Sequence, residues 1–217
     1  MFFIGAYTDN NAKSAGLVIV RKHLKNVKHH YHAVTAWETA LSGLETTLAT
    51  LYNDPSLIIK KRVFSQDRRP TKDVSAHPTI IMSSRPIDTA ICANLRHKHI
   101  PVEFISLTST GDVTVETPGK AGVGRDFTVP DTAIAVTLAR VISQERYVAD
   151  CELALERSEI INGVSGCLSG LAVDKSDLPV SSWPPALTAL AAILWFRENN
   201  RYTRTYRTSS IRKRRFG

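Results

Sequence analysis

The chain has 217 residues, of which 43% are hydrophobic and 22% are charged, and its formal net charge is +8. These values are typical of a globular protein with one sizeable core, and no apolar run approaches the roughly 18–20 residues that a membrane span needs. Cys92, Cys151 and Cys167 are odd in number and have no CxxC spacing. This argues against a disulfide framework or a zinc site and favours an intracellular compartment.

The first fifty residues predict an antiparallel meander and then a helix. Apolar stretches at 2–8 and 16–22 are rich in β-forming residues and are separated by a turn-like segment, and 28–34 has the composition of a third strand. Residues 35–52 place a tryptophan and four leucines at helical spacing. We therefore expect three consecutive strands and an amphipathic helix.

The middle of the chain predicts a parallel unit. Residues 65–78 are polar and contain prolines, as loops do, and 79–84 form a continuous apolar strand. A helix over 87–97 and a strand over 100–107 follow with short connections, which is typical of a parallel β-α-β unit. Residues 109–126 are rich in glycine, threonine and charge and predict another loop.

The C-terminal half predicts three helices. The first covers 130–143 and is opened by Pro130 and Asp131, a proline and an acid that both suit the first turn of a helix. The second covers 149–161, and the third, which is strongly apolar, covers 184–197. No domain boundary is indicated before about residue 198, so we expect one domain over residues 1–197.

Residues 198–217 are expected to form a basic tail. From Arg197 to the end the chain has seven arginines, one lysine and a single acid, Glu198, so most of the net charge lies there. Such a tail indicates contact with a polyanion, and a solvated end that aids solubility is the simpler alternative. The candidate nucleic-acid-binding residues are Arg201, Arg204, Arg207, Arg212, Lys213, Arg214 and Arg215.

The order of the predicted elements resembles the ribonuclease H-like fold. That resemblance implies an α/β protein with a mixed sheet, in which three antiparallel strands precede a parallel β-α-β unit and helices flank the sheet. Within this superfamily, "FFIGAYTDNNAKSAGLVIV" and "TIIMSSRPIDTAICANLRHKHIPVEFISLTSTGD" are similar in pattern and order to the nuclease domain of the phage terminase large subunit. "FTVPDTAIAVTLARVISQERYVADCELALERSEI" and "WPPALTALAAILWF" extend the similarity over most of residues 2–196.

Nucleases of this fold hold two Mg²⁺ or Mn²⁺ ions, about 4 Å apart, between converging carboxylates. The terminase pattern implies acids in the first strand, at the end of the central strand and at the start of the last helix. This chain has Tyr7, Ser83, Pro184 and Pro185 at those positions. A neutral hydroxyl or a proline cannot replace a carboxylate ligand, so the resemblance implies a degenerate site.

A second resemblance, to ribonuclease H itself, covers the first third of the chain through "AYTDNNAKSAG" and "TAWETALSGLE". It implies Asp9 and Glu38 as metal ligands, Ser84 in place of the central acid, and Asp150 or Glu152 as a later ligand. Each acid also has a structural alternative. Asp9 suits a turn, Glu38 is spaced as the partner of a capping residue three positions earlier, and Asp150 suits a solvated helix surface.

Three hypotheses follow from these patterns. The first is a catalytically degenerate, nucleic-acid-binding relative of the terminase nuclease that binds DNA, needs no cofactor and has protein partners in a packaging or mobile-element complex, in the cytoplasm or a virion. The second is an active nuclease in which Asp9, Glu38 and Asp150 bind Mg²⁺ or Mn²⁺. The third is a structural or assembly protein in which only the tail binds nucleic acid.

Overall fold

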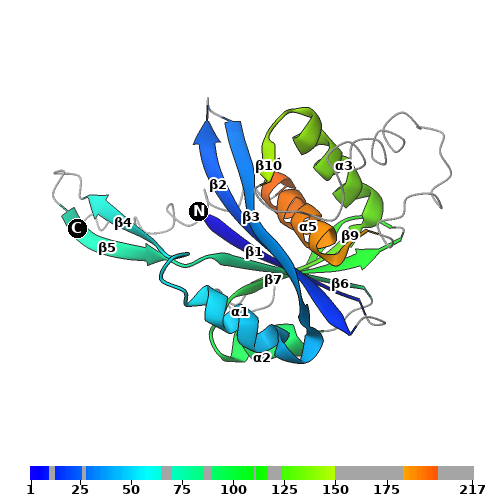
Figure 1. Cartoon of the computed structure of the whole chain (residues 1–217), viewed down its shortest axis with the longest axis horizontal. Helices are drawn as coiled ribbons and strands as arrows, with labels where there is room; N and C mark the ends of the chain where they lie inside the picture. Colours follow the sequence, from blue (N-terminus) through cyan, green and yellow to red (C-terminus); the bar gives the residue numbers. More distant parts are fainter. Residues whose placement is uncertain are drawn as a thin grey trace, which may run out of the picture.

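The computed structural model describes residues 1–9, 13–25, 28–64, 70–85, 89–109, 111–116, 124–149 and 183–199. Within these ranges, eight strands form one mixed sheet in the order β10-β3-β2-β1-β6-β7-β9-β8 (Figure 1). The strands are β1 (Phe2–Asp9), β2 (Ser14–Lys25), β3 (Lys28–Ala40), β6 (Thr79–Arg85), β7 (Val102–Thr108), β8 (Thr114–Glu116), β9 (Asp126–Pro130) and β10 (Tyr147–Ala149).

The sheet has an antiparallel half and a parallel half. Strands β1, β2 and β3 pair antiparallel in sequence order, and β1 also pairs parallel with β6. Strand β6 continues through helix α2 (Ala90–His97) to β7, which is parallel to it, and β9 is parallel to β7. The predicted mixed sheet, with three antiparallel strands before a parallel β-α-β unit, is confirmed.

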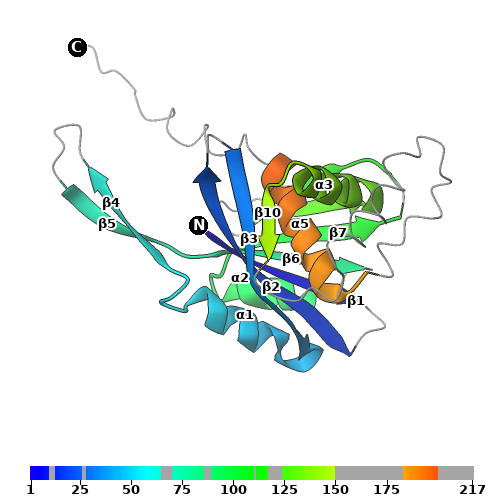
Figure 2. The same ribbon diagram turned by 45° about the horizontal axis from the view of Figure 1, so that its top comes forward.

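Helices cover both faces of the sheet (Figures 1 and 2). Helix α1 (Leu44–Tyr52) and α2 bury Leu48 and Leu95 against one face, together with Ile4 of the central strand. Helices α3 (Asp131–Ser143) and α5 (Pro185–Asn199) pack on the other face. Strand β1 is buried on both sides, and α5 is buried all round from Ala186 to Phe196, which explains why both segments are almost uniformly apolar.

The helix predicted over 35–52 begins later than expected. Strand β3 runs to Ala40, a 3₁₀ turn covers Leu41–Gly43, and only then does α1 begin. The prediction that Glu38 lies in a helix was therefore wrong, together with its capping-box role. Strand β3 pairs with β2 along its whole length, from Lys28 to Ala40, and this ladder outweighs the helical spacing of the side chains.

Three further assignments change. The segment predicted as a loop over 65–78 contains strand β5 (Pro70–Ala76), which pairs antiparallel with β4 (Ile59–Phe64), and the two strands extend away from the main sheet (Figure 1). Backbone pairing between its two strands holds this hairpin, so it needs no apolar periodicity. Part of the second predicted loop forms β8, paired with β9. Ala149 ends β10 rather than starting a helix, and the rest of the helix predicted to 161 lies outside the described residues.

A buried polar cluster anchors the end of α5. The Glu198 carboxylate accepts hydrogen bonds from Tyr31 Oη at 2.6 Å and from two guanidinium nitrogens of Arg146, at 2.6 and 3.1 Å. Arg146 Nε also donates to the carbonyl oxygen of His29 at 2.8 Å. Burial, and then the hydrogen bond to Glu198, raises the pKa of Tyr31 above its ordinary value of 10.0. The cluster joins α5 to β3 and to the connection before β10.

Helix α5 thus includes Arg197 and Glu198, the first charged residues of the basic C-terminal region. The seven cations that were expected to contact nucleic acid, from Arg201 to Arg215, lie outside the described residues. None of the helices in the described ranges is long and apolar enough to cross a membrane.

Candidate functional site at the carboxyl edge of the parallel strands

The positions at which the terminase resemblance implies acids lie together at one edge of the sheet. Tyr7 in β1 is the register partner of Ser83 in β6 on one side and of Gly16 in β2 on the other. The start of α5 packs directly on Gly16, because a Cβ atom at that glycine would lie 2.2 Å from the carbonyl carbon of Pro185. The structure therefore brings Tyr7, Ser83 and Pro185 close to one another, and none of them carries a carboxylate.

The two consecutive serines have different environments. Ser83 is fully buried, and its hydroxyl donates to the carbonyl oxygen of Ala6 at 3.1 Å. Ser84 is also fully buried but points to the opposite face of the sheet, where its register partner is Thr8. Ser83 therefore satisfies its own hydroxyl within the sheet, in a dry site where an unpaired carboxylate would carry a large desolvation penalty.

An arginine lies beside these positions. Arg85 is the last residue of β6, and its guanidinium group donates to the carboxylate of Asp131, the first residue of α3. Asp131 is 6% exposed, so the ion pair is largely removed from water on the acid's side. Burial by itself lowers the pKa of Arg85, but the hydrogen bond and charge of Asp131, with a smaller contribution from Tyr7, outweigh it and raise that pKa. A guanidinium cation is thus fixed next to Tyr7.

Of the acids expected in an active nuclease, only Glu38 has a described side chain, and it does not lie beside this cation. Glu38 is exposed on β3, two strands away from β1, and accepts a hydrogen bond from the hydroxyl of Ser14 at 3.1 Å. Two strand spacings separate backbones by about 10 Å. Asp9 ends β1 as the register partner of Arg85, but its side chain is not among those described. Asp150 lies outside the described residues.

The described side chains at this edge do not fit a pair of divalent cations. Two such ions need several converging oxygen ligands with negative charge. Tyr7 and Ser83 are hydroxyl groups, and the carboxylate of Asp131 already pairs with Arg85. Across the ranges that the structure describes, no group of three or more histidine, cysteine, aspartate or glutamate side chains is arranged to hold a metal.

Sequence reasoning missed both members of the ion pair. Arg85 directly follows the two serines in "SSRP" and was not considered as a site residue, and Asp131 was assigned only to the start of a helix. A signal was present, because both residues lie where a predicted strand or helix meets a loop. In a parallel sheet such positions converge at the carboxyl edge, and one of them carries a positive charge while the other carries a negative charge.

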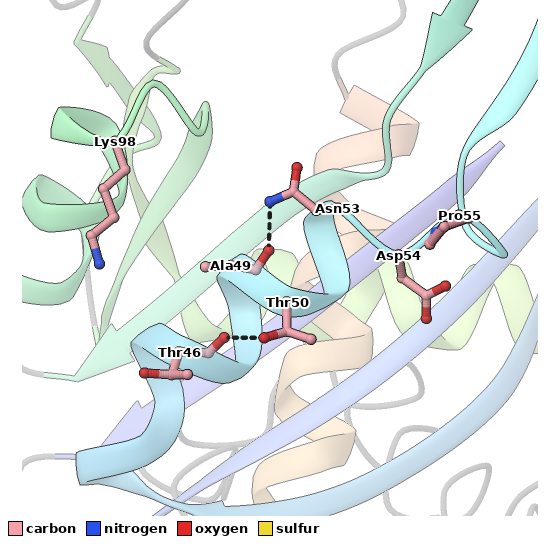
Figure 3. Close-up of a pocket in the computed structure, with 7 residues that line it drawn as sticks. All are labelled: Thr46, Ala49, Thr50, Asn53, Asp54, Pro55 and Lys98. Carbon is pink, nitrogen blue, oxygen red and sulfur yellow. Dashed lines mark hydrogen bonds between the residues drawn. The ribbon is translucent and has the colours of Figure 1, made fainter.

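A shallow groove on the other face of the sheet is less suited to chemistry. It lies between the outer side of α1 and Lys98, which follows α2 (Figure 3). Thr50 and Asn53 donate to backbone carbonyls of their own helix, at 2.9 Å each. Lys98 Nζ donates to Glu45 at 2.6 Å. Most polar groups of the groove are therefore already engaged locally.

The Arg85–Asp131 pair makes a testable contribution to stability. We expect Arg85→Met to lower the free energy of unfolding by about 2 kcal/mol, because it leaves the buried carboxylate of Asp131 without its partner. The double variant Arg85→Met, Asp131→Leu should recover most of this loss, since no unpaired charge remains. Urea denaturation measures both. A single variant as stable as the wild type would contradict the buried pair.

Comparison of the chain with protein-family models, with curated proteins and with solved structures gives no match. The chemistry of the carboxyl edge is therefore inferred from its own residues. These are a partly buried guanidinium–carboxylate pair, a tyrosine and a serine, held at the junction of the central parallel strands with α3 and α5.

Proposed function

We propose that this chain is a nucleic-acid-binding protein with a ribonuclease H-like fold, similar to the terminase nuclease, that has lost the metal cluster. The order of the sheet supports the fold, because β3, β2 and β1 are antiparallel neighbours and β6 and β7 continue the sheet in parallel. In chain order, helix α1 comes after β3 and before β6, the next strand of the main sheet, as the resemblance implies.

One observation supports the proposed loss of nuclease activity. The guanidinium of Arg85 lies beside Tyr7 and is paired with Asp131. In a two-metal nuclease the cations are the positive charges of the site and the protein supplies the negative ones. Here the protein itself supplies a cation, the guanidinium of Arg85, and the nearest described carboxylate, that of Asp131, is paired with it. A divalent ion placed next to Arg85 would be repelled by it.

The charge distribution supports nucleic acid as the ligand. Seven cations and no acid follow Asn199, in a chain whose net charge is +8. Arginine matches the geometry of phosphate with two parallel donors, and the tyrosines interleaved with these arginines can stack on unpaired bases. We assign the ligand as DNA, handled in a viral or mobile-element context with protein partners.

The test is a binding and cleavage assay with the purified full-length chain. We expect salt-sensitive binding to labelled double-stranded DNA. The logarithm of the binding constant should fall with the logarithm of the salt concentration with a slope of about −5, if about six phosphates are neutralised. We expect no cutting of double-stranded DNA, single-stranded DNA or an RNA–DNA hybrid in Mg²⁺ or Mn²⁺.

Two variants separate the alternatives. Metal-dependent cutting that disappears in Asp9→Asn, Glu38→Gln would establish an active nuclease and overturn the proposal. The third hypothesis, that only the tail binds nucleic acid, is tested by changing the seven tail cations to glutamine. Loss of all binding in this variant would show that the tail makes the only contact with nucleic acid. An absence of both binding and cutting by the wild type would refute nucleic-acid binding altogether.

A further inference from the structure

The far end of the β2–β3 hairpin projects beyond its neighbours in the sheet (Figures 1 and 2). Strand β1 pairs with β2 only as far as Arg21, and the backbone of Met1 bonds to Lys22. Strand β10 pairs with β3 only from Tyr31 onward. Among the described strands, the segments beyond these points pair only with each other, and on the β3 side the carbonyl oxygen of His29 also accepts a hydrogen bond from Arg146. These segments form a two-stranded ribbon.

One face of this ribbon carries cations and imidazoles. Arg21, His23 and Lys25 alternate along β2 and therefore share a face. Their register partners in β3 share that face, and we call the six residues the basic ribbon face. They form the pairs Arg21–His32, His23–His30 and Lys25–Lys28. The first pair lies at the base of the ribbon, where Arg21 also pairs with Phe2 of β1 and His32 with Val148 of β10, and the other two pairs lie in the projecting part.

The cations of the basic ribbon face are available to a partner. Arg21, Lys25 and Lys28 are exposed, and within the described part of the chain none of the three has a carboxylate partner. The guanidinium of Arg21 lies over the ring of Phe2, 5.9 Å from its centroid, which supports the base of the face. The ribbon thus presents positive charge that the described carboxylates do not neutralise.

The histidines of the basic ribbon face lie close to its cations. The rings of His23 and His30 are stacked, with centroids 5.7 Å apart. Burial, followed by the charges of His30, Arg21, His32 and Lys25, holds the pKa of His23 below its ordinary value of 6.5. On β3, Lys28 also lies on this face, and the amino group of Met1, which precedes β1, donates to the carbonyl oxygen of Lys22.

The dimensions of the ribbon suit double-stranded DNA. Residues two apart on a strand are about 6.6 Å apart, so the rows His23–His30 and Lys25–Lys28 project about 13 Å beyond the base row Arg21–His32, while the two strands are only about 4.8 Å apart. A two-stranded ribbon of this kind fits the major groove, which is about 12 Å wide. The two stacked histidine rings already cover each other, and Tyr31 is buried, so the ribbon offers little surface for the base stacking that single strands require.

We propose that the basic ribbon face binds the phosphates of double-stranded DNA with the ribbon seated in a groove. This inference deepens the proposed function and rests on it, because it assigns part of the DNA contact to the folded domain rather than to the tail. Phosphates close to His23 favour its protonated imidazole, so binding takes up protons and strengthens as the pH falls.

The first test compares two full-length triple variants that lose the same charge. The ribbon variant is Arg21→Gln, Lys25→Gln, Lys28→Gln, and the matched control is Lys13→Gln, Lys60→Gln, Lys98→Gln, which changes exposed lysines elsewhere. Fluorescence anisotropy with a labelled 30-base-pair duplex gives the affinity over a range of salt concentrations. We expect the ribbon variant to bind about tenfold more weakly or worse, with a salt slope reduced by about 2 to 3, and the control to keep the wild-type slope.

The second test uses pH as the variable. We expect wild-type affinity for the duplex to rise between pH 7.5 and pH 6.0, and His23→Gln, His30→Gln to flatten that rise. Equal losses in the ribbon variant and the control, or a loss confined to single-stranded DNA, would overturn the inference while leaving the proposed function intact. A wild-type chain that binds no nucleic acid would refute both.

Discussion

Replacing Glu198 by glutamine is expected to lower the free energy of unfolding by about 3 to 5 kcal/mol. The side chains of Glu198 and Arg146 are 3% and 5% exposed, and the carboxylate binds two guanidinium nitrogens of Arg146 as well as the hydroxyl of Tyr31. The amide keeps the shape of the carboxylate but leaves the guanidinium charge of Arg146 buried and uncompensated. Urea denaturation followed by circular dichroism measures the loss.

The surface pair between Glu45 and Lys98 provides the control. Its lysine is 58% exposed and its N–O distance is 2.6 Å, the same as in the Arg146–Glu198 pair. Glu45→Gln should change stability far less than Glu198→Gln, because water replaces the lost partner. Equal effects in the two variants would mean that burial of the Arg146–Glu198 pair does not determine its contribution. Recovery of stability in Arg146→Met, Glu198→Leu would identify the unpaired charge as the cause of the loss.

Replacing Gly16 by alanine is expected to destabilise the protein by about 3 kcal/mol or more. The added methyl group would lie 2.2 Å from the carbonyl carbon of Pro185 and 2.3 Å from the backbone nitrogen of Ala186. These are backbone atoms at the start of a helix that is packed into the core, so they cannot move aside as a flexible side chain does. Thermal unfolding and urea denaturation should both show the loss.

Gly43→Ala is the matched control for this substitution. Gly43 immediately precedes α1, its φ angle is −95°, and the nearest heavy atom that a new Cβ would meet is Thr39 Oγ1 at 4.0 Å. Alanine is therefore sterically acceptable at this position, and the stability should change little. A tolerated alanine at Gly16 would show that α5 does not approach β2 closely, and would remove the contact that places Pro185 beside Tyr7.

The two substitutions also bear on the proposed function in different ways. Glu198 anchors the C-terminal end of α5, and the basic tail follows that end in the sequence. Gly16 has no side chain, and this allows the N-terminal end of α5 to pack against the carboxyl edge of the sheet. Helix α5 therefore connects the candidate site to the tail through one buried element. Binding assays on either variant should be run at temperatures where it remains folded, so that lost affinity is not confused with unfolding.

Much of the sheet could be predicted from local patterns. The sequence predicted the uniformly apolar strand β6, the helix and strand after it, and the buried C-terminal helix. The spacing of apolar residues within each segment is enough to indicate its secondary structure and its burial. The absence of carboxylates at Tyr7, Ser83 and Pro185 also followed from the sequence once their positions in the pattern were assigned. The register that makes Tyr7 and Ser83 neighbours agrees with that assignment.

Other features depended on contacts between distant residues. Glu38 was expected in a helix because its neighbours have helical spacing, but pairing with β2 placed it in a strand. Arg85 and Asp131 are 46 positions apart, and Arg146 and Glu198 are 52 apart. No local pattern reports such a pair, because each partner alone has the composition of an ordinary surface charge. The sequence by itself determined the order of the main elements, the apolar segments and the basic tail, but it did not predict strands β4, β5, β8, β9 and β10. The tertiary structure alone decided which charges are buried together, because burial and pairing of a charge depend on residues far away in the chain.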